Sequence, residues 1–372
     1  MPGLIVHEWI APHGGSENVV EAMARVLPGA DILSLWNDAP GRFQGRAVKE
    51  SWLARTPLRK SKAAALPFMP VTWARTDVSG YDYVLVSSHL FAHHVGGPVR
   101  ADGPKKFVYV HTPARYIWTP ELDARGDNVI ARAVSPFLRR LDRDRARDGS
   151  IYAANSKYVR ARILDTWGQE SVVIYPPVDV TGLQSVGDWR AQLTGDELRT
   201  LEALPSSFVF GASRFVPYKR LDAVIAAGQA AGMPVVLAGA GPEEDLLRAA
   251  GEAANVPVAI VRAPSTAMLN ALYERAAVFV FLAVEDFGIM PVEAMSLGTP
   301  SVVYHVGGAR ESVEALGGGA VVRSLEPEAL AEGIDLALRV DMARAREAAP
   351  GLFGEEAFAR NLKNWMDLDA LR

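Results

Sequence analysis

The sequence contains no cysteine among its 372 residues. Disulfides, zinc sites built on thiolates and cysteine nucleophiles are therefore excluded. It also lacks any uncharged apolar run of about 18 residues, so we expect no segment that spans a membrane. Neither sign of charge dominates, since 39 Lys and Arg stand against 43 Asp and Glu, a net charge of −4. Nucleic-acid-binding proteins are usually strongly basic, so we expect no nucleic-acid partner.

The amino terminus has no basic region followed by a long apolar stretch, so we predict no signal peptide and a cytoplasmic protein. Residues 52–69 are unusual because they mix lysine and arginine with tryptophan, leucine and phenylalanine. One interpretation is peripheral contact with an anionic acceptor or with the inner face of a membrane. The other is a loop and helix whose apolar side packs while its lysines are solvated. The sequence leaves both open.

The chain length suits two domains. Short apolar runs without alternation, rich in Val and Ile, alternate with helical stretches, which predicts parallel sheets covered on both faces. The predicted strands are Leu4–His7, Asp31–Leu35, Tyr83–Ser87, Lys106–His111, Ile151–Ala154, Ser207–Ala212, Pro234–Ala238, Val258–Val261, Val278–Leu282 and Thr299–Tyr304. The pattern restarts near residue 207, so we predict an α/β protein with two Rossmann-like doubly wound domains.

Two prolines mark the boundary between these domains, in Tyr175-Pro176-Pro177-Val178-Asp179. A polar segment, 188–206, follows before the next predicted strand. Near the other end, 355–371 is a predicted helix whose Phe358, Leu362, Trp365 and Leu368 should pack on an apolar surface. The Gly317-Gly318-Gly319 run is interpreted as a turn.

The most informative motif places Glu285 and Glu293 on either side of a strand-to-helix turn. Gly288 lets the backbone approach a ligand, and the amides of Phe287, Gly288 and Ile289 would lie at a helix N-terminus that stabilises an anion such as pyrophosphate. Glu293 lies one helical turn in and can accept hydrogen bonds from ribose hydroxyls. The alternative is a pair of glutamates that complements the helix dipole.

A second motif follows the strand that begins the second domain. Arg214 and Lys219 bracket a proline-containing turn before a helix. Two cations there can neutralise a diphosphate leaving group, and no metal is then needed. The alternative is a solvated loop.

Two glycine-rich turns also follow predicted strands. Gly239 and Gly241 form a GxG turn, which is a weak signal because tight strand–helix connections often have this form. Gly14 and Gly15 lie before the first helix, where backbone amides can face a phosphate or a sugar. An ordinary turn with Ser16 as the helix N-cap is equally compatible.

His111 ends a further strand and is followed by Arg115 and Trp118, which can contact a sugar or an acceptor. A single histidine is more often structural than catalytic. His89 and His93 are four residues apart and could share a helical face, but no nearby carboxylate or HExxH pattern supports a metal site. We therefore predict no metal.

Together these motifs resemble the retaining glycosyltransferases of family 4, which have the GT-B fold, two Rossmann-like domains facing across a cleft. The resemblance spans nearly the whole chain and is strongest from about residue 207 to 315, where Glu285 to Glu293 is followed by Gly298-Thr299-Pro300 and Gly307-Gly308-Ala309-Arg310-Glu311. Ala309-Arg310-Glu311 departs slightly from the family's usual residues after the Gly-Gly turn. Within the family, His111-Thr112-Pro113 with Arg115 and Trp118 most resembles bacterial mannosyltransferases that use GDP-mannose.

The resemblance implies a hexosyltransferase that needs no cofactor beyond its substrate, a nucleotide diphosphate sugar such as GDP-mannose or a UDP-sugar. It implies an acceptor-side domain of residues 1–178 with a crossing helix at 357–372, and a donor-binding domain of 179–356. Glu293 would hold the ribose, Arg214 and Lys219 the diphosphate, and Glu285 and His111 the donor sugar. The acceptor would be a hydroxyl of a lipid-linked glycan or of a small molecule.

Three other functions remain compatible with the sequence. A sugar-nucleotide epimerase shares the two-domain fold but needs no acceptor. A phosphorylase would carry a pyridoxal cofactor on a lysine. A non-catalytic sugar-nucleotide-binding protein would bind the donor without transferring its sugar.

Overall fold

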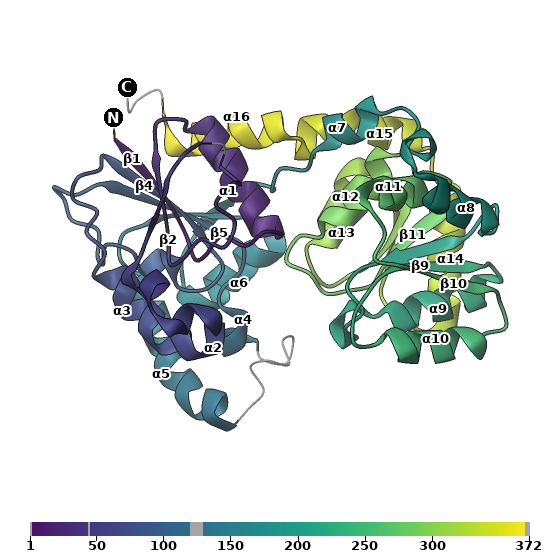
Figure 1. The fold of residues 1–372 in the computed structure, drawn as a ribbon, viewed down its shortest axis with the longest axis horizontal. Coiled ribbons are helices and arrows are strands. Elements are labelled where there is room, and N and C mark those ends of the chain that lie inside the picture. Colours follow the sequence, from purple (N-terminus) through teal and green to yellow (C-terminus); the bar gives the residue numbers. More distant parts are fainter. Residues whose placement is uncertain (1, 44, 120–128, 369–372) are drawn as a thin grey trace. The chain divides into compact units, whose positions relative to one another are not determined.

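A computed structural model describes residues 2–43, 45–119 and 129–368 of the chain (Figure 1). It divides the chain into two compact units, residues 1–177 with 358–372, and residues 178–357. The domain boundaries expected from the sequence differ from these by one residue at each break. Each unit is built on one parallel sheet, and we describe the two separately.

The first unit has a sheet with the strand order β3-β2-β1-β4-β5-β6-β7. Its strands are β1 (Gly3–His7), β2 (Asp31–Ser34), β3 (Val48–Glu50), β4 (Tyr83–Ser88), β5 (Lys105–Val110), β6 (Ile151–Ala154) and β7 (Ser171–Val173). The helices of this unit are α1 (Gly15–Val26), α2 (Lys62–Ala65), α3 (Met69–Ala74), α4 (Arg115–Trp118), α5 (Val129–Ala146) and α6 (Lys157–Trp167).

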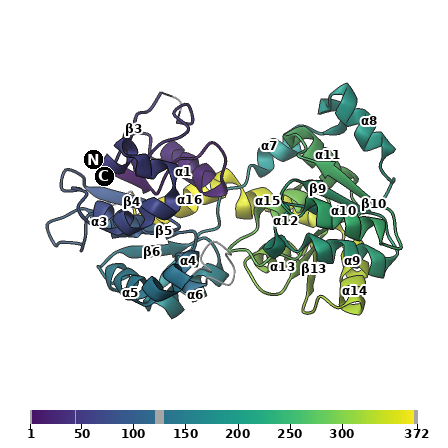
Figure 2. The ribbon, with the colours of Figure 1, turned by 60° about the horizontal axis from the view of Figure 1, so that its bottom comes forward.

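Alternate residues of β1 enter two different hydrophobic cores. Leu4 and Val6 face a core that includes Trp73 of α3 and Trp167 of α6, whereas Ile5 faces one that includes Met23 of α1. A strand with an apolar residue at every position is therefore buried on both sides, as the uninterrupted Val and Ile runs predicted. Helices cover both faces of this sheet (Figure 2).

The second unit has the strand order β10-β9-β8-β11-β12-β13. Its strands are β8 (Val209–Ala212), β9 (Val235–Gly239), β10 (Val258–Arg262), β11 (Val278–Phe281), β12 (Ser301–Tyr304) and β13 (Gly319–Val322). Its helices are α7 (Val180–Ser185), α8 (Gly195–Ala203), α9 (Leu221–Ala231), α10 (Glu244–Glu252), α11 (Thr266–Arg275), α12 (Ile289–Ser296), α13 (Ala309–Leu316), α14 (Pro327–Leu338) and α15 (Met342–Phe353).

The ten predicted strands are all present, each within two residues of its expected ends. Three strands were missed. β3 and β7 are only three residues long, and β13 begins at Gly319, the last residue of the glycine run interpreted as a turn. A side chain at Gly319 would collide with the carbonyl oxygen of Ser301 on β12, so a glycine is required inside this strand. The polar segment 188–206 contains α8, which a capping box between Thr194 and Glu197 starts.

Residues 52–69 fold into short turns of helix rather than one loop and one helix. They comprise 3-10 turns at Trp52–Arg55, Pro57–Lys60 and Leu66–Phe68, with α2 between the last two. Within the described ranges, no helix combines the length and the apolar composition needed to cross a bilayer.

The helix α16 (Glu355–Met366) carries the end of the chain onto the first unit. Phe358, Leu362 and Met366 are buried in the core that α1 also enters, and the ring of Trp365 lies 5.3 Å from that of Phe107 on β5. The predicted helix extended to residue 371, and residues 369–371 lie outside the described part of the chain.

Replacing Leu362 by alanine should lower the free energy of unfolding by about 2–5 kcal/mol, because the leucine is fully buried and its removal leaves a cavity. Asn364→Ala, at an exposed position of the same helix, should change it by less than about 0.5 kcal/mol. Urea denaturation of both variants tests this. Equal midpoints for the two would show that α16 does not contribute to the core.

Candidate active site

The sheet of the second unit has a switch point between β8 and β11. From β8 the chain continues to β9 and β10 on one side, then returns to β11 on the other. In open parallel sheets, ligands bind beyond the carboxyl ends of the strands at such a point. The two segments that leave the sheet there are 213–219 after β8 and 282–288 after β11. They contain Arg214, Lys219 and Glu285.

Lys219 and Glu285 form an ion pair between Nζ and Oε1 that joins these two segments. The side chains are 13% and 20% exposed, respectively, so the pair lies just below the surface. The ammonium group also lies 5.2 Å from the ring centre of Tyr218 and 5.8 Å from that of Phe281. The lysine is therefore held in place by a carboxylate and by two aromatic faces.

Arg214 is exposed and donates a hydrogen bond of 2.8 Å from Nη2 to the hydroxyl of Tyr218. Tyr218 thus contacts both predicted cations of the turn. This arrangement leaves the guanidinium accessible to an anionic ligand.

Gly288 is the N-cap of α12 and adopts φ of 86°, a left-handed conformation that favours glycine. A side chain there would approach the Cβ atom of Ala309 to 2.9 Å. Phe287 points into the core, with its ring 5.8 Å from that of Phe353, so its contact with a ligand is limited to the backbone. Ile289 begins the helix and is partly buried.

Glu293 lies in the second turn of α12, and burial raises the pKa of its carboxyl to about 7. The hydroxyl of Tyr273 donates a long hydrogen bond of 3.4 Å to its Oε2, which offsets this only in part. Near neutral pH the carboxyl is therefore divided between its neutral and charged forms. Hydroxyl donors from a ligand would favour the charged form.

Gly239 and Gly241 act on the loop after β8. At φ of 144°, Gly239 passes so close to the carbonyl of Ser213 that no side chain fits there. The amide of Phe215 also donates to the carbonyl of Ala240 at 2.9 Å. These glycines let the loop that carries Arg214 pack against its neighbour.

In the first unit, Gly14 is the N-cap of α1 and Gly15 its first residue. Ser16 lies inside the helix and is not the cap. Its hydroxyl donates to Oε2 of Glu17, whose other oxygen accepts a hydrogen bond from the amide of Ala11 at 3.2 Å. A buried carboxylate thus lies beside this glycine turn, a feature that the sequence did not indicate.

His111 follows β5 at the carboxyl edge of the first sheet. Its Nε2 lies 2.8 Å from the hydroxyl of Ser87 on β4, which in turn lies 3.1 Å from Nδ1 of His7. Burial, and secondarily the neighbouring His7 and His89, hold the pKa of His111 well below its usual value. Its imidazole is therefore neutral at pH 7 and can hydrogen-bond a hydroxyl.

Arg115 and Trp118 belong to α4, the short helix that follows His111. The indole N–H of Trp118 donates to Oδ2 of Asp142 at 2.7 Å, so this group serves the packing of α4 on α5. Arg115 is partly buried.

Asp142 centres a buried polar cluster that the sequence did not reveal. It accepts hydrogen bonds from the indoles of Trp118 and Trp167, and its Oδ1 lies 3.2 Å and 3.3 Å from Nε2 of His93 and of His94. His93 and then His94 hold the pKa of Asp142 far below its usual value, although burial alone would raise it. The cluster ties α5, α6 and the 3-10 turn at Ala92–His94 together.

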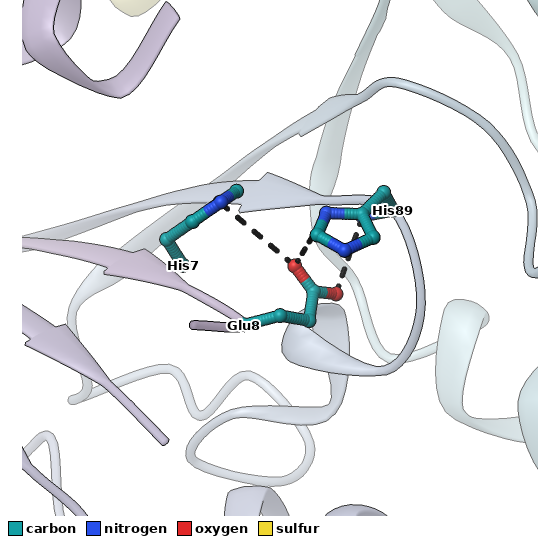
Figure 3. Close-up of side chains that lie close together, drawn as sticks. All are labelled: His7, Glu8 and His89. Atoms are coloured by element: carbon teal, nitrogen blue, oxygen red, sulfur yellow. Dashed lines mark hydrogen bonds and ion pairs between the residues drawn. The ribbon is translucent and has the colours of Figure 1, made fainter. Parts of the chain in front are cut away.

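Glu8 centres a second cluster, in which it lies between His7 and His89 (Figure 3). The sequence offered no carboxylate close to His89 and His93 along the chain, and the partners of these histidines come instead from distant segments. The fold brings His89 to Glu8 and His93 to Asp142, and each of these two sets can bring three ligand atoms together. The available signal was that Glu8 and His89 each directly follow a buried strand.

Comparisons with known proteins agree with this architecture. The model described as "Glycosyltransferase Family 4" matches residues 13–181, and that of "Glycosyl transferases group 1" matches residues 200–349. The sequence matches none of the curated proteins.

Solved glycosyltransferases share the fold at low sequence identity. Anabaena HepE, solved with UDP, has a TM-score of 0.70 at 19% identity, over 99% of this chain and 100% of its own. Sucrose-phosphate synthase from Thermosynechococcus elongatus has a TM-score of 0.68 at 18% identity, with complete coverage of both chains. WaaG, a glycosyltransferase of lipopolysaccharide biosynthesis, has a TM-score of 0.64 at 15% identity, over 96% of this chain and 99% of its own.

The two parallel α/β units are those of the GT-B fold. The protein is a glycosyltransferase whose first half matches glycosyltransferase family 4 and whose second half matches the group 1 glycosyl transferases.

Proposed function

We propose that the protein transfers a hexose from a nucleotide diphosphate sugar to an acceptor hydroxyl, with retention of configuration and without a metal ion. The observation that carries the proposal is the pairing of Lys219 with Glu285 at the switch point of the second sheet. The bond that breaks joins the sugar to the diphosphate. The cation suits the diphosphate, which gains negative charge, and the carboxylate suits the sugar, which presents hydroxyl groups.

The donor is assigned to the second unit. Lys219 and Arg214 bind the diphosphate, together with the first backbone amides of α12 beyond Gly288, where the helix dipole favours negative charge. Glu285 accepts hydrogen bonds from the sugar. Glu293 accepts them from the ribose, which would satisfy its partly buried carboxyl.

Transfer forms a bond between the acceptor oxygen and the anomeric carbon and breaks the bond from that carbon to the diphosphate. The electron pair of the broken bond leaves with the diphosphate, which takes up the proton that the acceptor hydroxyl loses. Attack on the face that the nucleotide leaves would retain configuration. His111 contributes a neutral hydrogen-bonding group for the donor sugar, with Arg115 and Trp118 on the acceptor side.

Guanine and uracil are the two leading candidates for the base of the donor nucleotide. The motif around His111 favours GDP-mannose, whereas Anabaena HepE was solved with UDP and with UDP-glucose. Thermal shift with GDP, UDP, ADP and dTDP distinguishes them, because a ligand at a hundred times its Kd stabilises the folded protein by about 2.7 kcal/mol.

Removing the ammonium group of Lys219 should slow the reaction while the donor still binds. Lys219→Ala should lower kcat by about 10²–10³-fold, because a charge that stabilises the leaving group is lost. The measurement is the release of nucleoside diphosphate in the presence of EDTA. The donor is the sugar nucleotide whose base gives the largest thermal shift. Near-normal turnover by this variant, or loss of wild-type activity in EDTA, would contradict the proposed role.

Donor affinity should depend on the ionisation of Glu293. Its raised pKa means that ribose binding must release a proton below about pH 7, so affinity should increase about tenfold between pH 6 and pH 8. Isothermal titration with the matching nucleoside diphosphate measures this. Glu293→Gln is the control. In this variant the affinity should still vary with the ionisation of the ligand's phosphates, but it should no longer vary with the ionisation of residue 293. Identical pH dependence in both proteins would exclude Glu293 from the ribose site.

We further propose that residues 52–69 contact an anionic membrane surface, which suits a lipid-linked acceptor. Trp52 and Phe68 are 52% and 42% exposed, and their rings lie 6.3 Å apart. From 51 to 76 the sequence has five lysines and arginines and no aspartate or glutamate. The charged residues of this segment are all basic, which suits anionic lipid headgroups, and its exposed aromatic pair suits the interface between the headgroups and the acyl chains.

Replacing Lys60 and Lys62 by glutamine should weaken binding to phosphatidylglycerol vesicles by roughly 2 kcal/mol, at about 1 kcal/mol for each charge. Trp52→Glu should also reduce binding. Leu246→Glu, at a position 67% exposed in the second unit, is the matched control and should leave binding unchanged. Cosedimentation with anionic and with pure phosphatidylcholine vesicles measures this, and equal binding to both would contradict the assignment.

A further inference from the structure

The cluster of His7, Glu8 and His89 lies at the switch point of the first sheet. β1 pairs with β2 on one side and with β4 on the other, and His7 is aligned with Ser87. Glu8 directly follows β1, and His89 directly follows β4. This edge of a parallel sheet is where ligands bind. The cluster therefore occupies in the first unit the position that Lys219 and Glu285 occupy in the second.

Glu8 is a fully buried and ionised carboxylate. Its Oε1 accepts hydrogen bonds from the backbone amides of His89, Leu90 and Ala92, at 3.2, 2.8 and 3.0 Å. Burial raises its pKa, but the attraction of His89 and His7 and the amides of Ala92 and Leu90 outweigh this and lower the pKa overall. The carboxylate is consequently both charged and fixed in position.

The second oxygen of Glu8 faces His89. Oε2 lies at an ion-pair distance of 3.3 Å from Nδ1 of His89 and 3.9 Å from Nδ1 of His7, and Oε2 and Nδ1 of His89 are both buried without a hydrogen-bond partner among the described residues (Figure 3). A carboxylate at Nδ1 places the ring proton there and leaves Nε2 as an acceptor. The ring is further held by an edge-on contact with Trp9 at 4.8 Å.

His89 is the accessible member of the cluster, since its side chain is 21% exposed whereas those of His7 and Glu8 are fully buried. An imidazole whose inner nitrogen is held by a buried carboxylate offers an outer nitrogen that accepts a hydrogen bond from a hydroxyl. This chemistry suits a polyol rather than an anion, because Glu8 supplies negative charge behind the ring.

We propose that the Glu8–His89 pair binds a hydroxyl group of a glycoside acceptor. The inference rests on the proposed glycosyl transfer and assigns it a residue for acceptor recognition in the first unit. His89 contacts the acceptor, and Glu8 positions His89. No bond is made or broken at this pair.

The decisive variants change His89 alone. His89→Phe keeps an aromatic ring beside Trp9 but removes the acceptor nitrogen, and His89→Gln restores a hydrogen-bonding group. Glu8→Gln is less informative, because it also alters the hydrogen bonds that hold residues 89–92.

Transfer is measured from GDP-mannose and UDP-glucose to the octyl glycosides of glucose, galactose and mannose, alongside hydrolysis to water. His89→Phe should raise the KM for the glycoside about tenfold, which is the effect of one lost hydrogen bond. The KM for the donor and the rate of hydrolysis should not change, and His89→Gln should recover most of the loss. Unchanged glycoside KM in His89→Phe, or wild-type hydrolysis without transfer to any glycoside, would overturn the proposal.

Failure of the proposed function has a different signature, since the wild type would then release no diphosphate from either donor. Long-range ¹H–¹⁵N NMR of the histidines is independent of activity and should show His89 with its proton on Nδ1. A proton on Nε2 would contradict the inference. So would one equivalent of Zn²⁺ or Mn²⁺ bound to the wild type and not to His89→Phe, because the cluster would then be a metal site.

Discussion

The chemistry of this protein depends on one constraint, the convergence of loops beyond the carboxyl ends of parallel strands. In a parallel sheet the carboxyl ends of all strands lie at the same edge. Where the strand order reverses, the loops that follow two neighbouring strands diverge and leave room for a ligand between them. In the second unit this place lies between β8 and β11, where Lys219 meets Glu285. In the first unit it lies between β1 and β4, where Glu8 meets His89. Two sheets with unrelated side chains thus present polar groups at equivalent positions.

The ion pair of Lys219 and Glu285 has a further consequence for ligand binding. Each side chain holds the other in a partly buried position before any ligand arrives, so less conformational entropy is lost on binding. The ammonium group has three donors, and one carboxylate oxygen does not exhaust them. A diphosphate can therefore bind the lysine without displacing Glu285. The ion pair therefore favours a site that is organised before the donor binds over one that the donor assembles.

The sequence was sufficient to locate the long buried strands and the residues that follow them. Fully covered strands such as β4 and β11 appear as unbroken apolar runs, and glycine or proline marks the turns that follow. It did not reveal β7, whose three residues carry too little pattern. Nor could it reveal the contact of Glu8 with the amide of His89, 81 residues further along the chain, because only the pairing of β1 with β4 brings them together. The sequence thus predicted which residues follow the strands, but it did not predict which distant residues they contact.

Glu8, which is fully buried, and Glu293, which is partly buried, show how the surroundings of a carboxyl distinguish a structural role from a binding role. Glu8 has three amide donors on one oxygen, and these together with two histidines keep it charged. Glu293 has one long hydrogen bond from Tyr273, and its pKa rises to about 7. The backbone satisfies one oxygen of Glu8, whereas Glu293 receives only the long hydrogen bond from Tyr273. A carboxyl that lacks hydrogen-bond donors, such as that of Glu293 in α12, is stabilised most by a ligand that brings them, and a ribose diol brings two.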